Sequence, residues 1–501
     1  MMNAPSVLGV LLFAVLATGA TPKPSKPAPA HQAASAAPAK QAPDPGAQEP
    51  PLVPLDDPFI KTFEFAPMGT VYAYLPKKID DDTDIVLFAS GDGGWEPRVV
   101  DMVVKMQARG QIVVGFSTPE YLKRIDASKL KCAYPPGELE GLSQFIQRKL
   151  GIRIYRVPVV VGYSSGASLA YVAMAQTPIN AFVGAVGLGF CPDLALTKPL
   201  CRQGALTTAP QFDTDHWRLE PIDKLVAPLE ILQGQADELC KVDDVEAFMK
   251  QVGNANVTTL PKVGHGFSSV SEWFPTFTTA YDAIDAKRPT EAPPSSAALA
   301  GLPLIERPIE SKGNTFVVML SGDGGWSTLT EKVTTELNET GYPVVGWNML
   351  KYFWSAKTPE HAAGDLATII RYFAKTWHKD QVVLAGYSMG ADVLPAIVNR
   401  LPIAEQQRVR SIVLMAPERS TDFEFHLGGW LQHIPKDAQP IAPEVAALPD
   451  GVRMTCIYGS DEAERSLCTQ LDSNKATLTL KALPGAHHFD GNYEALAKLV
   501  R

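Results

Sequence analysis

The sequence predicts an α/β protein that contains two tandem copies of one fold, each built on a mostly parallel, doubly wound sheet. Four sequence blocks occur twice, in the same order along the chain. Each block begins with a short run of aliphatic and β-branched residues and ends in a stretch that contains glycine. Such runs are typical of strands buried on both faces of a parallel sheet. Amphipathic stretches, as at 97–108 and 328–339, separate the blocks, and this strand–helix alternation indicates the α/β class.

The first element along the chain is an expected export signal at 1–20. Residues 7–17 are uniformly apolar, too short a run to cross a bilayer but typical of a signal-peptide core, and Ala20 ends a run of small residues suited to cleavage. Residues 21–55 are rich in proline and alanine and predict a disordered linker. We therefore expect an exported protein that resides in the periplasm.

Composition narrows the class of protein. The 501 residues carry a net charge of −9 and 46% of them are hydrophobic, so the chain is globular and lacks the basic surface of a nucleic-acid-binding protein. Its six cysteines show no C-x-x-C spacing, which argues against a metal centre and favours disulfides in an exported chain. Proximity in the sequence suggests Cys191–Cys201 and Cys456–Cys468, although other pairings stay open. We expect no cofactor.

The duplicated blocks define the domain boundaries. The paired segments are 85–95 with 316–326, 158–166 with 382–390, 230–237 with 455–462, and 257–267 with 478–489. The spacing also agrees, since 70 residues separate Ser164 from Gly234 and 71 separate Ser388 from Gly459. The repeat is therefore a whole domain and not a short solenoid unit. The predicted parts are a first domain at 56–285, an interdomain linker at 286–305 and a second domain at 306–501.

Each copy contains the motif G-x-S-x-G between a predicted strand and a predicted helix. The glycines allow a sharp turn that exposes the serine at the end of the sheet, and this turn is the nucleophile elbow of α/β hydrolases. The motif lies at 162–166 around Ser164 and at 386–390 around Ser388. We therefore predict two tandem α/β-hydrolase-like domains, each with a candidate nucleophile.

A triad acid is expected after a later strand of the same fold. In the first copy Asp237 stands in the sequence Gly-x-x-Asp. The same spacing in the second copy favours Glu462, and its neighbour Asp461 is the alternative. The acid would orient the histidine and stabilise its cation.

The histidine of the triad is expected last in this fold. In the first copy it is His265. Alignment of PGAHHF at 484–489 with PKVGH at 261–265 favours His488 in the second copy, with His487 as the alternative. This base would take the proton of the serine hydroxyl.

The sequence SGDGGW follows an earlier strand in both copies, at the place where this fold supplies a donor to the oxyanion hole. Glycines present backbone N–H groups without an obstructing side chain, so they suit the charge of a tetrahedral intermediate. The residue after each nucleophile supplies the other donor. The predicted donors are Gly324, Gly325 and Met389 in the second copy, and Gly93, Gly94 and Ser165 in the first.

Four motifs of the second copy are more specific than G-x-S-x-G. They are SGDGGW at 321–326, KYFW at 351–354, GYSMGADV at 386–393 and PGAHHF at 484–489. On these motifs the chain resembles the AcvB/VirJ family, over 56–501 and most closely in the second copy. The resemblance implies a periplasmic serine ester hydrolase that cleaves aminoacyl-phosphatidylglycerol, notably the lysyl form, through the C-terminal domain. The resemblance also implies an alternative, a non-catalytic accessory protein that binds envelope or type IV secretion proteins. An esterase of another class is the further alternative that the hydrolase motifs leave open.

Several side chains are compatible with an aminoacyl phospholipid at a membrane surface. Acidic residues near the catalytic edge would pair with its amine, and an aromatic run with a lysine would meet the lipid phosphate and the interface. The acids are Asp323, Asp392, Glu418 and Asp422, and the run is Lys351, Tyr352, Phe353 and Trp354. The competing interpretations are solvated acids and core aromatics.

Overall fold

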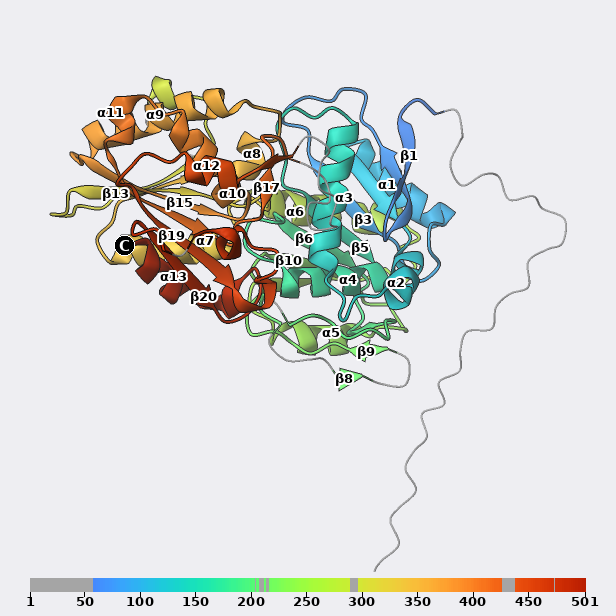
Figure 1. Ribbon diagram of the computed structural model, residues 1–501. Coiled ribbons are helices and arrows are strands. Elements are labelled where there is room, and N and C mark those ends of the chain that lie inside the picture. Colours follow the sequence, from blue (N-terminus) through green and yellow to red (C-terminus); the bar gives the residue numbers. More distant parts are fainter. Residues whose placement is uncertain are drawn as a thin grey trace, which may run out of the picture. The chain divides into compact units, whose positions relative to one another are not determined.

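The structure is a computed structural model, and it describes residues 57–202, 204–206, 211–212, 216–288, 296–425, 438–472 and 474–501. The predicted signal peptide at 1–20 and the predicted linker at 21–55 lie outside these residues, as do residues 289–295 of the predicted interdomain linker. Pro51–Arg501 forms one compact unit. Within this unit each copy has its own sheet and its own set of helices (Figure 1).

The first copy is built on an eight-stranded sheet in the order β1-β2-β4-β3-β5-β6-β10-β11. Its strands are β1 (Ile60–Phe65), β2 (Gly69–Tyr74), β3 (Ile85–Ala89), β4 (Ile112–Phe116), β5 (Val159–Tyr163), β6 (Gly184–Leu188), β10 (Leu229–Gly234) and β11 (Ala255–Leu260). Neighbours from β4 to β11 are parallel, whereas β1 and β2 extend one edge in antiparallel pairing. The central strands are buried along their whole length, which explains their uninterrupted apolar sequences.

Helices cover both faces of this sheet. Alternate side chains of β3 enter two different cores, Leu87 on one face and Phe88 on the other. The face of Phe88 is covered by α1 (Pro97–Gln107) and α6 (Val270–Asp285). The opposite face is covered by α2 (Thr118–Ala127), α3 (Pro135–Lys149), α4 (Ser165–Gln176) and α5 (Val242–Met249). The doubly wound arrangement predicted from the sequence is confirmed.

The second copy repeats this plan with a seven-stranded sheet in the order β12-β14-β13-β15-β16-β19-β20. Its strands are β12 (Leu304–Arg307), β13 (Thr315–Leu320), β14 (Val344–Trp347), β15 (Gln381–Tyr387), β16 (Val409–Met415), β19 (Arg453–Gly459) and β20 (Leu478–Leu483). Only the edge strand β12 pairs antiparallel within this sheet. β12 begins at Leu304, within the range 286–305 that the sequence predicts as the interdomain linker.

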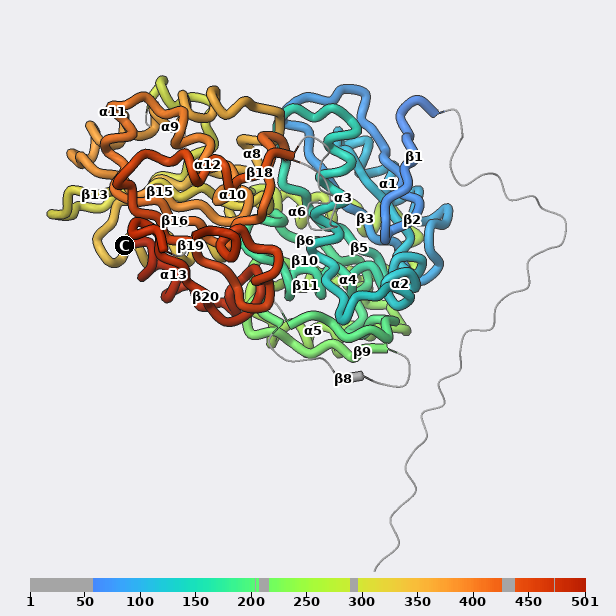
Figure 2. Tube along the Cα trace, viewed as in Figure 1, coloured from blue at the N-terminus to red at the C-terminus, as the bar shows by residue number. Residues whose placement is uncertain are grey.

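The helices of the second copy again form two layers. One face of the sheet is covered by α7 (Thr328–Glu339) and α13 (Tyr493–Val500). The other face is covered by α8 (Met349–Tyr352), α9 (Pro359–Thr376), α10 (Met389–Asn399) and α12 (Ala442–Ala446). The short α11 (Ile403–Gln406) follows α10. The helices predicted at 97–108 and 328–339 are therefore α1 and α7. Figure 2 shows the chain path through both copies.

Short strands lie in the connection between β6 and β10 of the first copy and in the connection between β16 and β19 of the second. They are β7 (Asp193–Leu194), β8 (Gln211–Phe212) and β9 (Trp217–Arg218) in the first copy, and β17 (Ser420–Thr421) and β18 (Gln439–Pro440) in the second. They add a small antiparallel sheet to each copy. These insertions lengthen the loops that surround the two sheet edges.

Three disulfides join the six cysteines. The predicted Cys456–Cys468 bridge is confirmed, with 5.5 Å between the Cα atoms. The predicted Cys191–Cys201 bridge is wrong, because Cys191 pairs with Cys240 and Cys201 pairs with Cys132. These partners lie far apart in the sequence, so folding of the domain and not local proximity selects them. Three disulfides fit an exported protein. Among the described residues, no helix combines the length and apolar character needed to cross a membrane.

The two copies contact each other through an aromatic cluster. Trp354 of the second copy lies against Tyr155 of the first, with 5.0 Å between ring centroids, and donates its indole N–H to the Ile152 carbonyl at 2.9 Å. Arg148 of α3 lies over the Trp354 ring and pairs with Glu424 at 2.6 Å. This interface joins apolar packing to charged hydrogen bonds across the two domains.

Two candidate active sites

Both candidate nucleophiles occupy the same strained turn. Ser164 lies between β5 and α4 with φ 54° and ψ −120°, and Ser388 lies between β15 and α10 with φ 51° and ψ −123°. The turn needs glycine beside the serine, because a side chain on Gly162 would lie 2.0 Å from the Gly166 carbonyl oxygen. Left-handed backbone at a non-glycine residue is costly and concentrates at functional sites. Both turns are therefore nucleophile elbows, as the sequence predicts.

The first copy brings its predicted triad together. Ser164 Oγ lies 2.9 Å from His265 Nε2, and His265 Nδ1 lies 2.8 Å from Asp237 Oδ2. The Asp237 side chain is fully buried, and it also accepts hydrogen bonds from Gln233 and from the backbone N–H of Cys240. These donors fix the carboxylate, which in turn fixes the imidazole. The geometry is that of a serine nucleophile with its base and orienting acid.

A second carboxylate also reaches the first nucleophile. Ser164 Oγ donates to Asp92 Oδ2 at 3.0 Å. Asp92 belongs to the SGDGGW loop after β3 and is exposed to solvent. Sequence reasoning considered only its counterpart in the second copy, Asp323, and missed Asp92. The signal was present in the sequence, since both residues occupy the same position of the duplicated motif.

In the second copy the acid and the histidine pair, but the histidine is not the one favoured by the sequence. Glu462 Oε2 lies 3.2 Å from Nδ1 of His487. That contact lowers the pKa of the Glu462 carboxyl. Asp461 instead accepts from Ser460 Oγ and is exposed. The preference for Glu462 over Asp461 therefore agrees with the geometry.

Three equivalent features show that His487, and not His488, occupies the position of His265. Tyr163 OH donates to the His265 carbonyl at 3.1 Å, and Tyr387 OH donates to the His487 carbonyl at 3.3 Å. The N–H group of Ala236 donates to the Val263 carbonyl, two residues before His265. In the same way, the N–H group of Asp461 donates to the Gly485 carbonyl, two residues before His487. The phenylalanine two residues after each of these histidines has positive φ, 46° at 267 and 53° at 489. The sequence alignment of His488 with His265 is therefore wrong.

The loops that carry these histidines differ in length by one residue. The strand ladders place Leu260 opposite Gly234 and Leu483 opposite Gly459, so the prolines that follow do correspond. Beyond the proline the second copy has one residue fewer before the turn, which shifts the histidine by one position. The sequence alone does not reveal this difference in length, because either of the two adjacent histidines can be aligned with His265.

His488 lies in a different environment from a triad base. His488 is exposed as a residue, but desolvation of its ring, together with the neighbouring His487, lowers its pKa to about 4, so the ring is neutral at pH 7. Its Nδ1 lies 3.1 Å from the hydroxyl of Tyr387. His488 thus contacts the hydroxyl of the elbow tyrosine, and among the described residues no hydrogen bond joins it to the acid Glu462.

The second site is only partly assembled. Within the described part of the chain, Ser388 Oγ has no hydrogen-bond partner, although Glu462 and His487 are paired with each other. A pocket beside this pair is lined also by Tyr458, Glu418 and Arg465. The first copy, by contrast, has a continuous chain of contacts from serine to acid. The two copies therefore differ in readiness for nucleophilic attack.

The SGDGGW loop is anchored in the same way in both copies. Trp95 fills the space above Gly115 of β4, where an added side chain would lie 1.7 Å from the indole ring. Trp326 occupies the equivalent space above Gly346 of β14. This packing explains why the motif ends in tryptophan. It also brings the start of the loop against the nucleophile, since a side chain on Gly91 would lie 3.1 Å from Ser164 Cβ.

The glycines predicted as oxyanion donors have other partners in the second copy. Gly324 N–H donates to Asp323 Oδ1 at 3.0 Å, and Gly325 N–H donates to the Gly322 carbonyl at 3.1 Å. Neither N–H is available to an oxyanion in this conformation, so the geometry does not favour Gly324 and Gly325 as donors. Met389 begins helix α10 directly after Ser388, as the prediction requires, with its N–H in the first turn.

The acids predicted to bind the substrate amine occupy different environments. Asp392 is buried within α10, where burial raises the pKa of its carboxyl well above the usual value, and it accepts from the Glu418 N–H at 2.8 Å. Glu418 pairs with Arg465 at 3.0 Å. Asp323 is partly exposed at the edge of the site. Of these three acids, Asp323 therefore has the most suitable position for a cation.

The aromatic run at 351–354 does not form a lipid-facing surface. Trp354 is only 2% exposed and packs in the interdomain cluster, so the prediction that it meets a membrane is wrong. Tyr352 and Phe353 are also buried, and Tyr352 donates to Asp365 at 2.6 Å. Lys351 is partly exposed on the short helix α8. Core packing explains the aromatic residues of this motif.

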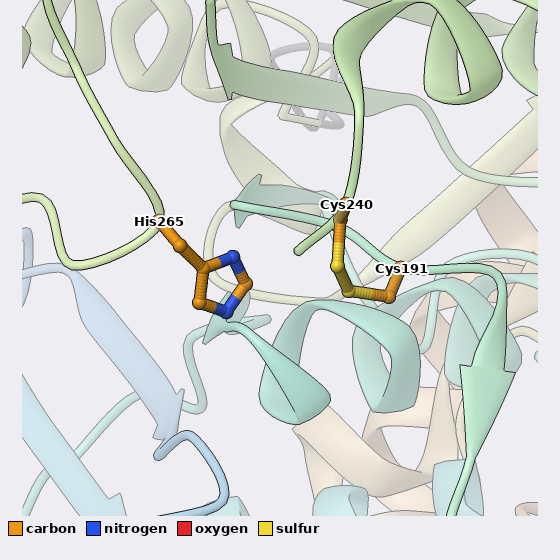
Figure 3. Close-up of side chains that lie close together, drawn as sticks. All are labelled: Cys191, Cys240 and His265. Atoms are coloured by element: carbon orange, nitrogen blue, oxygen red, sulfur yellow. A yellow bond between two sulfur atoms is a disulfide. The ribbon is translucent and has the colours of Figure 1, made fainter. Parts of the chain in front are cut away.

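The Cys191–Cys240 disulfide lies beside the first triad. The potential ligand atoms of Cys191, Cys240 and His265 lie within 4.8 Å of one another, and Figure 3 shows the imidazole next to the bridge. Both sulfurs are consumed by the disulfide, and thiolates are the form of cysteine that binds metals. The bridge connects the loop after β6 to the turn that holds Asp237. It is therefore a structural support for the triad acid.

Comparison with known proteins gives a family for the second copy and a set of similar folds. A comparison with curated proteins finds no match. Three similar solved structures are Est1E from Butyrivibrio proteoclasticus (12% identity, 45% of this chain and 99% of that one, TM-score 0.30), the esterase domain of a Rhodothermus marinus protein (15%, 45% and 97%, 0.30) and Thermogutta terrifontis esterase 2 phosphorylated by paraoxon (12%, 46% and 94%, 0.32).

The fold and the Ser–His–Asp arrangement of the first copy are those of a carboxylic ester hydrolase of the α/β-hydrolase type. The family model described as bacterial virulence protein (VirJ) matches residues 314–501. This range covers the second copy from β13 to the C-terminal helix α13. The C-terminal domain of this chain therefore matches the model of the VirJ family.

Proposed function

We propose that this protein is a periplasmic serine hydrolase that cleaves the ester between the amino acid and the head group of aminoacyl-phosphatidylglycerol. The observation that carries the proposal is the assembled triad of Ser164, His265 and Asp237, with contacts of 2.9 and 2.8 Å. The sequence alone favoured the C-terminal Ser388 as nucleophile. The geometry favours Ser164, because only this serine is hydrogen-bonded to its base within the described residues.

The triad acts in two half-reactions. His265 Nε2 accepts the hydroxyl proton as Ser164 Oγ attacks the ester carbonyl, and Asp237 stabilises the imidazolium that results. His265 then returns the proton to the departing glycerol oxygen, which releases phosphatidylglycerol and leaves an aminoacyl ester on Ser164. A water molecule, activated by the same histidine, hydrolyses that ester and releases the free amino acid.

The lipid substrate is supported by the family resemblance and by the charge of the sites. Residues 314–501 match the VirJ model, and the AcvB/VirJ resemblance implies aminoacyl-phosphatidylglycerol, with lysyl as the proposed amino acid. The amine of such a lipid is a cation. Acidic residues stand at the same loop position beside both nucleophiles, Asp92 in the first copy and Asp323 in the second. The three disulfides support an exported location.

The test is release of amino acid from the lipid by the purified chain and two serine variants. We expect Ser164→Ala to lower lysine release from lysyl-phosphatidylglycerol vesicles by a factor on the order of 10⁴ or more. Ser388→Ala is the matched variant at the other elbow, and we expect it to lower release far less. A fluorophosphonate probe, read by peptide mass spectrometry, reports which serine reacts in each protein.

The other outcomes distinguish the competing functions. Loss of release in Ser388→Ala alone would return the site to the C-terminal domain, as the sequence first predicted. Hydrolysis of simple esters without any release from the lipid would assign the protein to another esterase class. Absence of probe labelling at both serines would favour a non-catalytic protein that binds envelope or secretion-system partners.

A further inference from the structure

The hydroxyl group of the first nucleophile has one proton and lies beside two hydrogen-bond acceptors. Ser164 Oγ lies 3.0 Å from Asp92 Oδ2 and 2.9 Å from His265 Nε2. A hydroxyl group has a single O–H donor, so it can satisfy only one of these acceptors at a time. When the proton points to Asp92, the base cannot accept it. Asp92 therefore competes with the catalytic base for the nucleophile in the absence of substrate.

Asp92 is also an unfavourable neighbour for ordinary ester hydrolysis. Attack by Ser164 generates negative charge on the carbonyl oxygen, and enzymes stabilise that charge with donors and positive groups. An ionised carboxylate in contact with Oγ acts in the opposite sense. Within the described residues Asp92 forms no ion pair with a basic side chain that would cancel its charge. A cation supplied by the substrate would remove both the repulsion and the competition.

The α-ammonium group of an aminoacyl ester has the required position. Its nitrogen is separated from the ester carbonyl carbon by a single carbon atom. In an attack geometry that carbonyl carbon lies roughly 3–3.5 Å from the serine oxygen. A carboxylate already in contact with Oγ is then within reach of the ammonium, at the short distance typical of charged hydrogen bonds. Asp92 is exposed, so the substrate can reach it.

We propose that Asp92 binds the free α-ammonium group of the substrate and thereby restricts the first site to α-aminoacyl esters. This inference rests on the proposed function, and it names the part of the substrate that is recognised. Binding of the ammonium occupies Asp92, and the Ser164 hydroxyl proton turns to His265 Nε2. No bond is made or broken in this step. Esters without the cation leave the proton with Asp92 and react slowly.

The second copy does not repeat this contact. Asp323 holds the same place in SGDGGW, but its Oδ1 accepts from the Gly324 N–H, and it is not hydrogen-bonded to Ser388 among the described residues. Asp323 instead acts on Glu140 of the first copy. Burial raises the pKa of Glu140 to about 8, and the negative charge of Asp323 is the second cause. Asp323 therefore serves as the matched position that separates an effect at Ser164 from one at Ser388.

The experiment compares soluble alanyl and N-acetylalanyl esters that have the same leaving group. The measured quantity is the ratio of kcat/KM for the two esters, in the wild type, Asp92→Asn, Asp323→Asn and Asp101→Asn, the last being an exposed acid on α1 that controls for net charge. We expect the wild type to prefer the free amine. Asp92→Asn should lower the ratio roughly 10- to 100-fold, as expected for loss of a charged hydrogen bond.

Labelling of Ser164 by the neutral fluorophosphonate probe shows that Asp92→Asn is folded. The proposal is overturned if Asp92→Asn leaves the ratio of the two kcat/KM values unchanged. It is also overturned if the ratio falls only in Asp323→Asn, or if it falls equally in Asp101→Asn. A ratio that depends on Asp92, in a protein that releases no amino acid from the lipid, supports the role of Asp92 and rejects the lipid substrate. A wild type that hydrolyses neither ester nor lipid rejects both proposals.

Discussion

Glu462 accepts a hydrogen bond from His487, with 3.2 Å between Oε2 and Nδ1, while the adjacent His488 faces the hydroxyl of Tyr387. The two histidines are neighbours in the sequence but belong to different environments. His487 is paired with an acid at the sheet edge and is partly exposed, whereas His488 is exposed and contacts the hydroxyl of the elbow tyrosine. This difference assigns separate roles to two residues that sequence comparison cannot distinguish.

The first prediction concerns these two histidines. In a Ser164→Ala background, which isolates the second site, we expect His487→Ala to abolish fluorophosphonate labelling of Ser388. His488→Gln should keep labelling, because His488 contacts Tyr387 and not Glu462. Labelling is measured by mass spectrometry of the peptide that contains Ser388. The reverse pattern would contradict the assignment of His487 as the partner of Glu462.

The second prediction concerns the disulfide beside the first triad. Cys191–Cys240 closes a loop with a sequence separation of 49, and its removal by paired Cys→Ser substitutions should cost about 3–4 kcal/mol of unfolding free energy. It should also lower kcat at Ser164, because the Cys240 N–H donates to Asp237 at 2.9 Å. Urea unfolding and ester hydrolysis measure the two effects.

The matched control is the Cys132–Cys201 disulfide, which has a sequence separation of 69 and no contact with the triad. Its removal should destabilise the protein by a similar amount with a smaller effect on kcat of the folded protein. Equal kcat values in the two double variants would show that the Cys191–Cys240 bridge does not support the acid.

The third prediction is a pH dependence of stability. Glu138 of α3 is buried, and burial raises the pKa of its carboxyl to about 7 from 4.5 although Tyr121 donates to it. The folded state therefore holds this proton more tightly than the unfolded state. Its stabilising contribution is complete below pH 4.5 and is lost as pH rises through 7.

Glu138→Gln removes this titration. Between pH 4.5 and pH 8 the wild type should lose about 3 kcal/mol of unfolding free energy relative to the variant, because only the wild type has the titrating carboxyl. Tyr121→Phe, which removes the donor, should raise the pKa of Glu138 further, so this variant should lose the contribution of Glu138 at a higher pH than the wild type does. A difference profile that is flat with pH would contradict the raised pKa.

The fourth prediction concerns Trp354 at the domain interface. Trp354→Ala should cost about 3–5 kcal/mol, because the ring is 2% exposed and packs on Tyr155 and Phe425. Trp354→Phe should cost less, since it keeps an aromatic ring and loses the hydrogen bond to Ile152. Calorimetry measures both. Unchanged stability with loss of binding to phosphatidylglycerol vesicles would instead support the membrane role first predicted for this residue.

The sequence by itself determined the architecture of this protein. The duplicated blocks, the apolar strand runs and the two G-x-S-x-G motifs each depend on residues close together in the chain, and the two sheets and the two elbows at Ser164 and Ser388 follow them. The Gly-x-x-acid spacing favoured Glu462 over Asp461, and Glu462 is the acid that contacts a histidine in the structure. The Cys456–Cys468 disulfide could also be predicted from the sequence, because its two cysteines lie only 12 residues apart.

Only the tertiary structure decided which distant groups meet. A one-residue deletion after β20 places His487 at the triad position, and packing across a domain pairs Cys191 with Cys240. Trp354 is buried by the other copy, and the loop after β3 carries Asp92 to Ser164, 72 positions away in the sequence. The physical reason is the same in each case. Loop lengths and packing between remote segments fix these contacts to within an ångström, and local sequence patterns carry no record of those distances.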